Sequence, residues 1–244
     1  MKPTELVYML EMQLLNDTAT IQAIQPMEDG KIAIILDKTI FYPQGGGQPA
    51  DHGTIKKGEA VFRVDDVRFT DGLVYHKGAF ESGELNVGDV VECQVDETRR
   101  SLNSRLHSAG HLLDYGLLDL KIELEPGKGY HFPDSPYVEY IGTLDEALKE
   151  KIQKQLEEAV NKIVEADLPV EVRIVEHGQL AALCKSVPDY LPAGKPARLM
   201  MVHGYPGIPC GGTHVQSTDL VGKVKITAIK SKKGNTRIGY GLID

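Results

Sequence analysis

The chain has 244 residues, enough for one large domain or two smaller ones with well-packed cores. With 41% hydrophobic and 25% charged residues and no internal repeat, it has the composition of an ordinary soluble globular protein. Three cysteines, an odd number, exclude a complete disulfide framework and predict a reducing, cytoplasmic compartment. Glu5 and Glu11 interrupt the first apolar stretch, so we expect neither a secretion signal nor a membrane span. The formal charge of −8 means that any nucleic acid would need a local basic surface.

The first part of the chain predicts short strands. Residues 1–15 have near-helical apolar spacing and predict a short helix or an irregular arm. Residues 19–23 and 32–36 are rich in β-branched residues, and Glu28, Asp29 and Gly30 between them predict the turn of a hairpin. Further strands are predicted at residues 53–55, 61–69, 73–76 and 90–95. Short strands separated by glycine turns favour a small β-barrel over residues 16–95.

From Asp96 onward the pattern changes to longer helical periods. Residues 96–120 carry apolar side chains every three to four positions and begin with Asp96 as a plausible N-cap. A second helix is predicted at residues 145–166 and a short one at 178–184. Strands are predicted at residues 130–132, 137–141, 170–175, 197–202 and 221–229. The fold class is therefore α+β: a small N-terminal β-barrel domain, residues 1–95, followed by an α/β domain, residues 96–244.

Two short segments far apart in the sequence form the clearest candidate for a metal site. His107 and His111 are four residues apart on a predicted helix, so both imidazoles lie on one face and can reach one ion. Cys210 and His214 have the same separation, with two glycines between them that favour a loop. Three imidazoles and one thiolate suit zinc. A rival interpretation makes Cys210 a nucleophile with His107 or His214 as its base, but it leaves two histidines without a role.

A glycine-rich loop at residues 41–51 is a second candidate site. Three consecutive glycines are typical of a structural turn, and a Walker-type phosphate loop is excluded because no Gly-Lys-Ser/Thr follows. Gly46 and Gly47 would nevertheless allow the backbone to approach a ligand closely. Gln44 and Gln48 offer side-chain amides beside them.

The remaining histidines and cysteines show no ligand spacing. The single histidines are expected to be surface or hydrogen-bonded residues: His52, His76, His131, His177 and His203. Cys93 and Cys184 lie in apolar surroundings and are expected to be inert core thiols. A basic run without any acidic residue forms either a solvated strand edge or a phosphate-binding face: Lys223, Lys225, Lys230, Lys232, Lys233 and Arg237.

The His-Ser-Ala-Gly-His segment from His107 and the Cys-Gly-Gly-Thr-His segment from Cys210 also carry a resemblance. They are similar to the zinc-site motifs of the editing domain shared by alanyl-tRNA synthetases and free-standing alanyl-tRNA editing proteins, the AlaX group. The similarity continues in the loop at residues 41–51 and in the Val-Asp-Glu-Thr-Arg-Arg segment at 95–100, in the family's order. The synthetases usually have threonine at the positions of Ser108 and Gly110, which puts the details of the pocket in question more than the type of reaction.

The resemblance implies a zinc-dependent aminoacyl-tRNA hydrolase that acts in trans, without ATP, on alanine tRNA mischarged with serine or glycine. It implies that Gln48, Gly46 and Gly47 shape the amino-acid pocket. An alternative from another class is an RNA-binding adaptor in which zinc only stabilises the fold. No membrane and no obligate protein partner is implied. The sequence leaves open whether all four ligands bind zinc at once or a water molecule completes the site.

Overall fold

The computed structural model describes residues 1–27, 30–189 and 191–243, and it divides into two compact units. Unit 1 comprises Met1–Gly45 and Pro49–Ser101, and unit 2 comprises Gly46–Gln48 and Leu102–Asp244. The chain thus passes from one unit to the other inside a helix, a few residues beyond the expected domain boundary at residue 95. Three residues of the glycine-rich loop group with unit 2.

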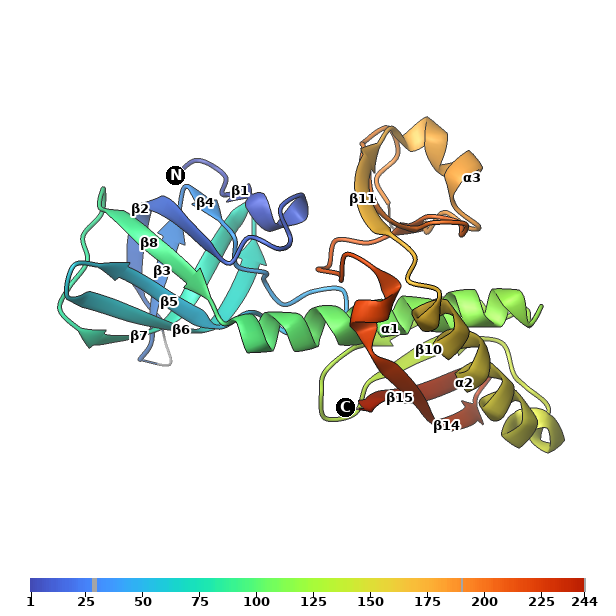
Figure 1. Cartoon of the computed structure of the whole chain (residues 1–244). Helices are drawn as coiled ribbons and strands as arrows, with labels where there is room; N and C mark the ends of the chain where they lie inside the picture. Colours follow the sequence, from blue (N-terminus) through green and yellow to red (C-terminus); the bar gives the residue numbers. More distant parts are fainter. Residues whose placement is uncertain (28–29, 190, 244) are drawn as a thin grey trace. The chain divides into compact units, whose positions relative to one another are not determined.

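Six strands of unit 1 close into an antiparallel barrel, which confirms the predicted barrel (Figure 1). In barrel order they are β2 (Asn16–Pro26), β3 (Ile32–Leu36), β7 (Leu73–Ser82), β6 (Ala60–Thr70), β5 (Gly53–Lys57) and β8 (Val90–Val95). Alternate side chains fill the interior: in β8, Val91, Cys93 and Val95 are buried while the residues between them are exposed. The predicted hairpin corresponds to β2 and β3, and Glu28 and Asp29 of its turn lie outside the described residues.

The N-terminal arm of unit 1 is short and irregular. It consists of β1 (Glu5–Leu6), which pairs in parallel with β4 (Lys38–Thr39), and a 3₁₀ turn at Val7–Met9. Arg100 and Asp51 form a buried ion pair in the same unit. The Arg100 guanidinium also donates to the carbonyl oxygens of Met12 at 2.7 Å and Ile40 at 2.6 Å, so it joins the arm, the loop and the start of the following helix.

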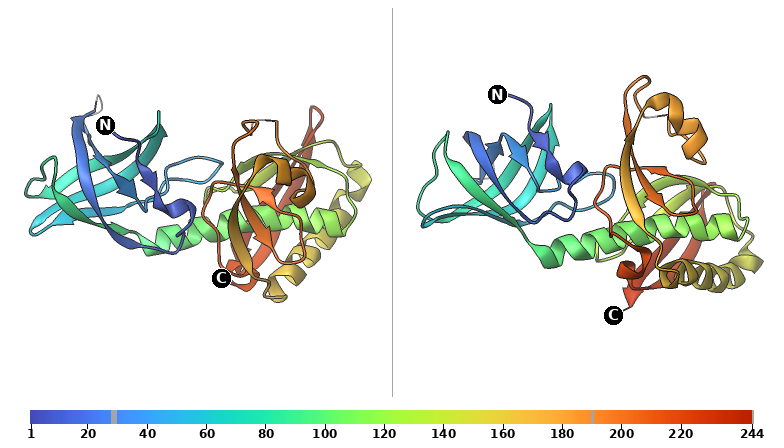
Figure 2. Two further views of the ribbon diagram at one scale, coloured as in Figure 1. Left: turned by 90° about the horizontal axis from the view of Figure 1, so that it is seen from above. Right: turned by 45° about the horizontal axis from the view of Figure 1, so that its top comes forward.

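Unit 2 is built on helix α1 (Glu97–Asp119) and a four-stranded antiparallel sheet. The sheet order is β14 (Lys223–Lys232), β15 (Asn235–Ile243), β10 (Tyr137–Ile141) and β9 (Glu125–Tyr130). Helix α1 crosses this sheet, where Tyr240 donates to the carbonyl oxygen of Leu106 at 2.9 Å and Tyr140 to Asp114 at 2.7 Å (Figure 2). The first turn of α1 is capped as predicted, since Oδ1 of Asp96 accepts from the backbone N–H of Arg99 at 3.0 Å.

Helix α2 (Lys149–Glu165) follows a 3₁₀ turn at Glu146–Leu148 and lies along the edge strand β14 (Figure 2). Asn161 and Glu157 bond to the backbone of Val224 and Ile226, which covers the free edge of the sheet. Among the described residues, none of the helices is both long and apolar enough to cross a membrane.

A three-stranded sheet completes unit 2. It contains β11 (Val170–Val175), β12 (Ala197–Val202) and β13 (Ile208–Pro209), with a 3₁₀ turn at His177–Gln179 and helix α3 (Leu180–Leu183) beside it. A last 3₁₀ turn, Thr218–Val221, precedes β14.

One predicted strand was misplaced. The sequence predicted a strand at residues 130–132, whereas β9 ends at Tyr130 and begins at Glu125. Pro126, Gly127 and Gly129 weaken the strand signal, yet this segment is held as an edge strand by pairing with β10. Strand β15 was not predicted at all, although its alternate residues are buried.

Candidate metal centre

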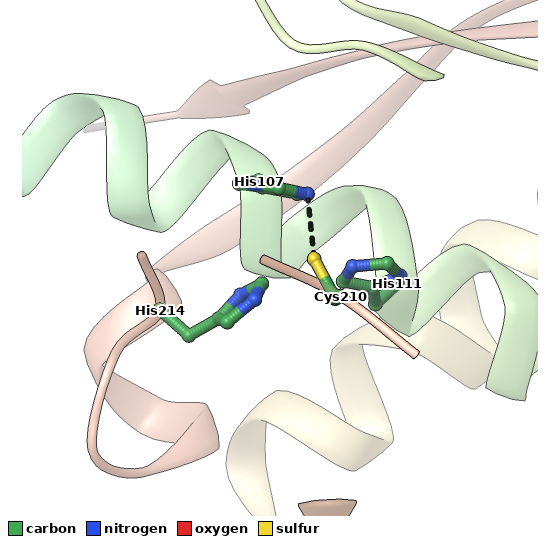
Figure 3. Close-up of side chains that lie close together, drawn as sticks. All are labelled: His107, His111, Cys210 and His214. Atoms are coloured by element: carbon green, nitrogen blue, oxygen red, sulfur yellow. Dashed lines mark hydrogen bonds between the residues drawn. The ribbon is translucent and has the colours of Figure 1, made fainter. Parts of the chain in front are cut away.

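Helix α1 places His107 and His111 one turn apart on one face, with ring centroids 5.0 Å apart. Cys210 and His214 lie between β13 and the last 3₁₀ turn. The candidate ligand atoms of the four residues lie within 4.8 Å of one another, and Nε2 of His107 is 3.4 Å from Sγ of Cys210 (Figure 3). Tetrahedral zinc with bonds of about 2.0–2.3 Å separates its ligands by roughly 3.3–3.8 Å. The four residues therefore need only a small contraction to hold a zinc ion.

An oxygen atom lies beside Nδ1 of each of the three histidines. The Nδ1–oxygen distances are 2.8 Å from His107 to Oε1 of Gln48, 3.3 Å from His214 to Oγ of Ser108, and 3.5 Å from His111 to Oδ2 of Asp114. Metal-binding histidines are commonly held in this way at one nitrogen, which leaves the other for the metal. Nε2 of His111 is buried and makes no hydrogen bond within the described residues, as suits a metal ligand.

The charges of the cluster favour a thiolate. Burial would raise the pKa of the Cys210 thiol, but the nearby imidazoles of His107, His214 and His111 hold it well below its ordinary value. Burial also lowers the pKa of His111, but the Cys210 thiolate and Asp114 raise it more, to about 10. Burial lowers the pKa of His214 to about 3. The residues would thus offer a metal one thiolate and three imidazoles, and this donor set fits zinc.

The glycine-rich loop contributes Gln48 to this centre. Its fully buried side chain accepts hydrogen bonds at Oε1 from Nδ1 of His107 at 2.8 Å and from the backbone N–H of Thr213 at 3.0 Å. Its Nε2 donates to Oγ1 of Thr213 at 2.8 Å. Gln48 thus orients His107 and fixes the segment between Cys210 and His214. For the expected contact with an amino acid, it has the second hydrogen of its amide left.

Close packing explains the glycines on both sides of the centre. A Cβ atom on Gly212 would lie 2.2 Å from the ring of His107. A Cβ atom on Gly47 would lie 2.2 Å from the carbonyl oxygen of Gly129, and Gly46 and Gly47 have positive φ angles of 52° and 78°. Only glycine adopts such angles without strain. The two loop glycines expected to shape a pocket are thus required by the backbone itself.

Parts of the chain match two protein-family models. A family model described as tRNA synthetases class II (A) matches residues 7–99, and one described as threonyl and alanyl tRNA synthetase second additional domain matches residues 198–239. Over 95% of its length the chain is 29% identical to the alanyl-tRNA editing protein AlaX-L of Pyrococcus horikoshii. The chain is thus similar to an alanyl-tRNA editing protein over almost its whole length. The resemblance inferred from the motifs is confirmed.

Alanine–tRNA ligases are also similar to this chain. Those of Cupriavidus necator and Leptospira biflexa are 33% and 34% identical to it over 87% and 84% of the chain. The match covers 56% of AlaX-L but only 24% and 22% of the two ligases, so the chain spans about half and about a quarter of these curated relatives. The second family model includes Cys210 and His214, and His107 and His111 lie outside both models.

His131 was missed by sequence reasoning as a site residue. It is hydrogen-bonded, as expected, but it is also buried, and its ring centroid lies 4.4 Å from that of His107. A Cβ atom on Gly110 would lie 2.4 Å from its Cε1 atom. The glycine that stands where the synthetases usually have threonine therefore leaves room for this ring. That departure was the one signal in the sequence, because a single histidine has no spacing pattern.

The other two cysteines lie apart from the cluster. Cys93 is buried in the barrel, where burial raises its pKa to about 12. Cys184 is half-buried, and burial raises its pKa as well. Both remain protonated thiols at neutral pH, in line with the expectation that they are inert.

The basic run lies on β14, β15 and the turn that joins them. All six side chains are exposed: Lys223, Lys225, Lys230, Lys232, Lys233 and Arg237. Lys225 pairs with Glu157 at 3.0 Å and Arg237 with Glu139 at 3.3 Å. Such exposed pairs are weak and can be exchanged for an interaction with another anion.

A stack of aromatic rings adjoins this run. The guanidinium carbon of Arg237 lies 3.9 Å from the ring centroid of Tyr137. Tyr130 stacks on Tyr137 at 5.3 Å and on Phe132 at 4.5 Å between centroids. The three rings are half-buried and come from β9, the residues just after it and β10, so no regular spacing in the sequence reveals them.

Proposed function

We propose that this protein is a zinc-dependent hydrolase that cleaves the ester between alanine tRNA and a wrongly attached serine or glycine. The observation that carries the proposal is the group of His107, His111, Cys210 and His214 in a chain related to an editing protein over 95% of its length. In the reaction, water adds to the acyl carbon and the bond to the terminal ribose oxygen breaks. A free amino acid and an intact tRNA hydroxyl result, and no ATP is needed.

The residues of the chain have distinct parts in this proposal. Zinc held by the four ligands would supply a Lewis acid that polarises the ester carbonyl or positions water. Gln48 and Ser108 hold Nδ1 of His107 and His214, which fixes both rings. Nη1 of Arg198 donates to the carbonyl oxygen of Cys210 at 2.6 Å and holds the backbone that carries the thiolate.

Selectivity would follow from polar contacts in the pocket. A site that hydrogen-bonds the hydroxyl of serine rejects alanine, because its own polar groups would then stay unpaired. A synthetase site sized for alanine excludes glycine and serine poorly by contact alone. We assign the border of the amino-acid pocket in this protein to Gly46, Gly47 and Gln48, beside the metal centre.

A second candidate function is an RNA-binding adaptor whose zinc only stabilises the fold. One observation favours it: four protein donors complete a tetrahedral zinc site, as in structural centres, whereas catalytic zinc usually keeps a position for water. The two candidates predict different behaviour of a folded, metal-free protein.

The tRNA partner would be bound through the basic run and the aromatic stack. Lysine and arginine set affinity for the phosphate backbone, and aromatic rings stack on unpaired bases. Changing both Lys232 and Lys233 to Glu should weaken tRNA binding and flatten the salt dependence by about one unit for each phosphate that the protein no longer binds. Filter binding at several salt concentrations measures both, and an unchanged slope would make this run a solvated strand edge.

We place the protein in the cytoplasm, because a zinc-binding thiolate and two further free thiols need a reducing compartment. The proposal requires no membrane and no obligate protein partner.

Hydrolysis of seryl-, glycyl- and alanyl-tRNA by zinc-loaded, chelator-treated and zinc-reloaded protein tests the proposal. We expect release of serine or glycine but not alanine, loss of this activity on chelation and recovery on reloading. Circular dichroism shows whether the metal-free protein stays folded. A folded protein that binds tRNA but leaves all three esters intact in every state would favour the adaptor.

A further inference from the structure

His131 follows β9 directly and lies in a space that three glycines leave open. Besides the Cβ on Gly110, a Cβ on Gly129 would lie 2.2 Å from Nε2 of His131, and one on Gly47 would lie 3.2 Å from its Cδ2. The backbone N–H of His131 donates to the carbonyl oxygen of Gly47 at 2.8 Å. Gly110 lies inside α1, where a glycine makes the helix less stable than an alanine would. The ring thus occupies a position to which helix, loop and strand are all fitted.

The hydrogen bonds of its neighbour fix the proton of this ring. The Tyr240 hydroxyl has one hydrogen, and it donates that hydrogen to the carbonyl oxygen of Leu106 at 2.9 Å. The same hydroxyl lies 2.6 Å from Nδ1 of His131, so its oxygen must accept a hydrogen bond from Nδ1–H. Nε2 of the neutral ring is then an acceptor, and it makes no hydrogen bond to the described residues.

This acceptor lies next to the metal centre. The His131 ring stacks on His107 at 4.4 Å with an angle of 21° between planes, and its centroid is 6.4 Å from that of His111. An ester whose carbonyl lay at the metal centre would have its amino group and side chain one carbon away from that carbonyl. Those two groups are the hydrogen-bond donors of a seryl ester, and the amino group is the donor of a glycyl ester.

We infer that Nε2 of His131 accepts a hydrogen bond from the aminoacyl group of the substrate. This inference rests on the proposed function, since it needs an aminoacyl ester at the metal centre. The ligand chemistry is a hydrogen-bond donor one carbon from the carbonyl, either the α-ammonium group or the serine hydroxyl. His131 is thereby a recognition residue for the aminoacyl group, and it discriminates serine from glycine only if the donor is the hydroxyl.

Two substitutions of similar size separate recognition from packing. His131→Gln keeps an acceptor near the position of Nε2, and His131→Leu fills the space without one. Hydrolysis rates on seryl- and glycyl-tRNA are measured on full-length protein with verified zinc content and melting temperature. If the donor is the hydroxyl, His131→Leu should slow seryl hydrolysis alone by roughly two- to tenfold. If it is the ammonium group, both rates should fall by roughly 10- to 100-fold. In both cases the His131→Gln variant should keep most of the rate of the unchanged protein.

Binding of a non-hydrolysable 3′-amide analogue of seryl-adenosine gives a readout without catalysis. We expect weaker binding to the Leu variant than to the Gln variant and the unchanged protein. The inference would be overturned if the Leu variant had the same rates and the same analogue affinity as the unchanged protein. It would also be overturned if the zinc-loaded Gln variant were as impaired as the Leu variant. If unchanged protein hydrolyses no aminoacyl-tRNA, the proposed function fails, whereas analogue binding still tests His131 separately.

Discussion

Two histidines, one in each unit, differ in a way that separates a structural side chain from a candidate metal ligand. In the barrel unit, His76 is fully buried, with Nε2 2.7 Å from the Thr39 hydroxyl and Nδ1 2.9 Å from the carbonyl oxygen of Ile34. Burial lowers its pKa to about 4, so it stays neutral. In unit 2, His111 is held at Nδ1 by Asp114, while its buried Nε2 makes no hydrogen bond among the described residues.

The contrast extends to neighbouring residues. In unit 1 the guanidinium of Arg100 and the carboxylate of Asp51 are buried and satisfy one another. In unit 2, Asn103 lies one helical turn before His107, and both atoms of its buried amide lack a hydrogen bond within the described residues. Burial of a polar group therefore does not mark a site by itself. Two side chains of α1 with buried polar atoms that lack an internal partner are a stronger indication, because the barrel has only the isolated Thr54 hydroxyl of this kind among its described residues.

The largest effect is expected for Cys210→Ala, which removes the one anionic soft ligand of the cluster. Zinc content should fall close to zero and hydrolysis by at least about 100-fold, because the loss of a ligand exceeds that of an orienting partner. Elemental analysis and rate measurement on the same sample check this. Cys93→Ala is the control, since that thiol is buried in the barrel and should leave zinc and rate unchanged. An inactive Cys210→Ala protein with full zinc would make the thiol a nucleophile.

Arg100→Met tests the buried ion pair of unit 1. Asp51 would keep its buried charge without its main partner, so the free energy of unfolding should fall by about 3–5 kcal/mol. Zinc content of the folded protein should not change. Arg63→Met removes exposed ion pairs with Asp65 and Glu81 in the same unit and should change stability little, as chemical denaturation can show. Similar losses in the two variants would contradict the structural role of the Arg100 pair.

Gln48→Ala sharpens the comparison within the glycine-rich loop. It removes the acceptor for Nδ1 of His107, so zinc affinity should fall roughly 10- to 100-fold, measured by competition with a chelator. The ratio of seryl- to alanyl-tRNA hydrolysis, measured with zinc in excess, tests the expected contact with the amino acid. Gln44→Ala alters an exposed glutamine four residues earlier and should leave affinity and ratio intact. Unchanged affinity in Gln48→Ala would show that His107 needs no such support.

The smallest effect is expected for Asn103→Leu. This change removes a buried amide without partners among the described residues and keeps a similar volume, so the protein should gain about 1–2 kcal/mol of stability. Hydrolysis should become slower, because a residue that costs stability beside a site is typically retained for function. Thermal melting and rates on seryl-tRNA provide the measurements. A more stable variant with full activity would assign Asn103 to the fold alone.

Sequence reasoning reached the local features of this fold and fell short on the distant ones. The hairpin of β2 and β3 and the helix α1 were predictable because their apolar periods and caps are local. Strand β9 was misplaced because its glycines and proline are typical of a turn, and only pairing with β10 makes it a strand. The hydrogen bonds of Gln48 with Thr213 span 165 residues, and no spacing rule reaches that far.

The same limit applied to the candidate site. His107, His111, Cys210 and His214 could be nominated together because each pair has ligand spacing and the ligand chemistry is restrictive. His131 and the stack of Tyr130, Phe132 and Tyr137 have no such signature, since their neighbours come from other strands and helices.

X-ray absorption at the zinc edge of the purified protein tests the central claim most directly. Three imidazole nitrogens at about 2.0–2.1 Å and one sulfur at about 2.3 Å are expected if the four residues hold zinc together. Loss of the sulfur signal in the Cys210→Ala variant would assign this sulfur to Cys210. A zinc ion surrounded only by nitrogen and oxygen, or a protein that takes up no zinc at all, would contradict the assignment of this cluster as the metal centre.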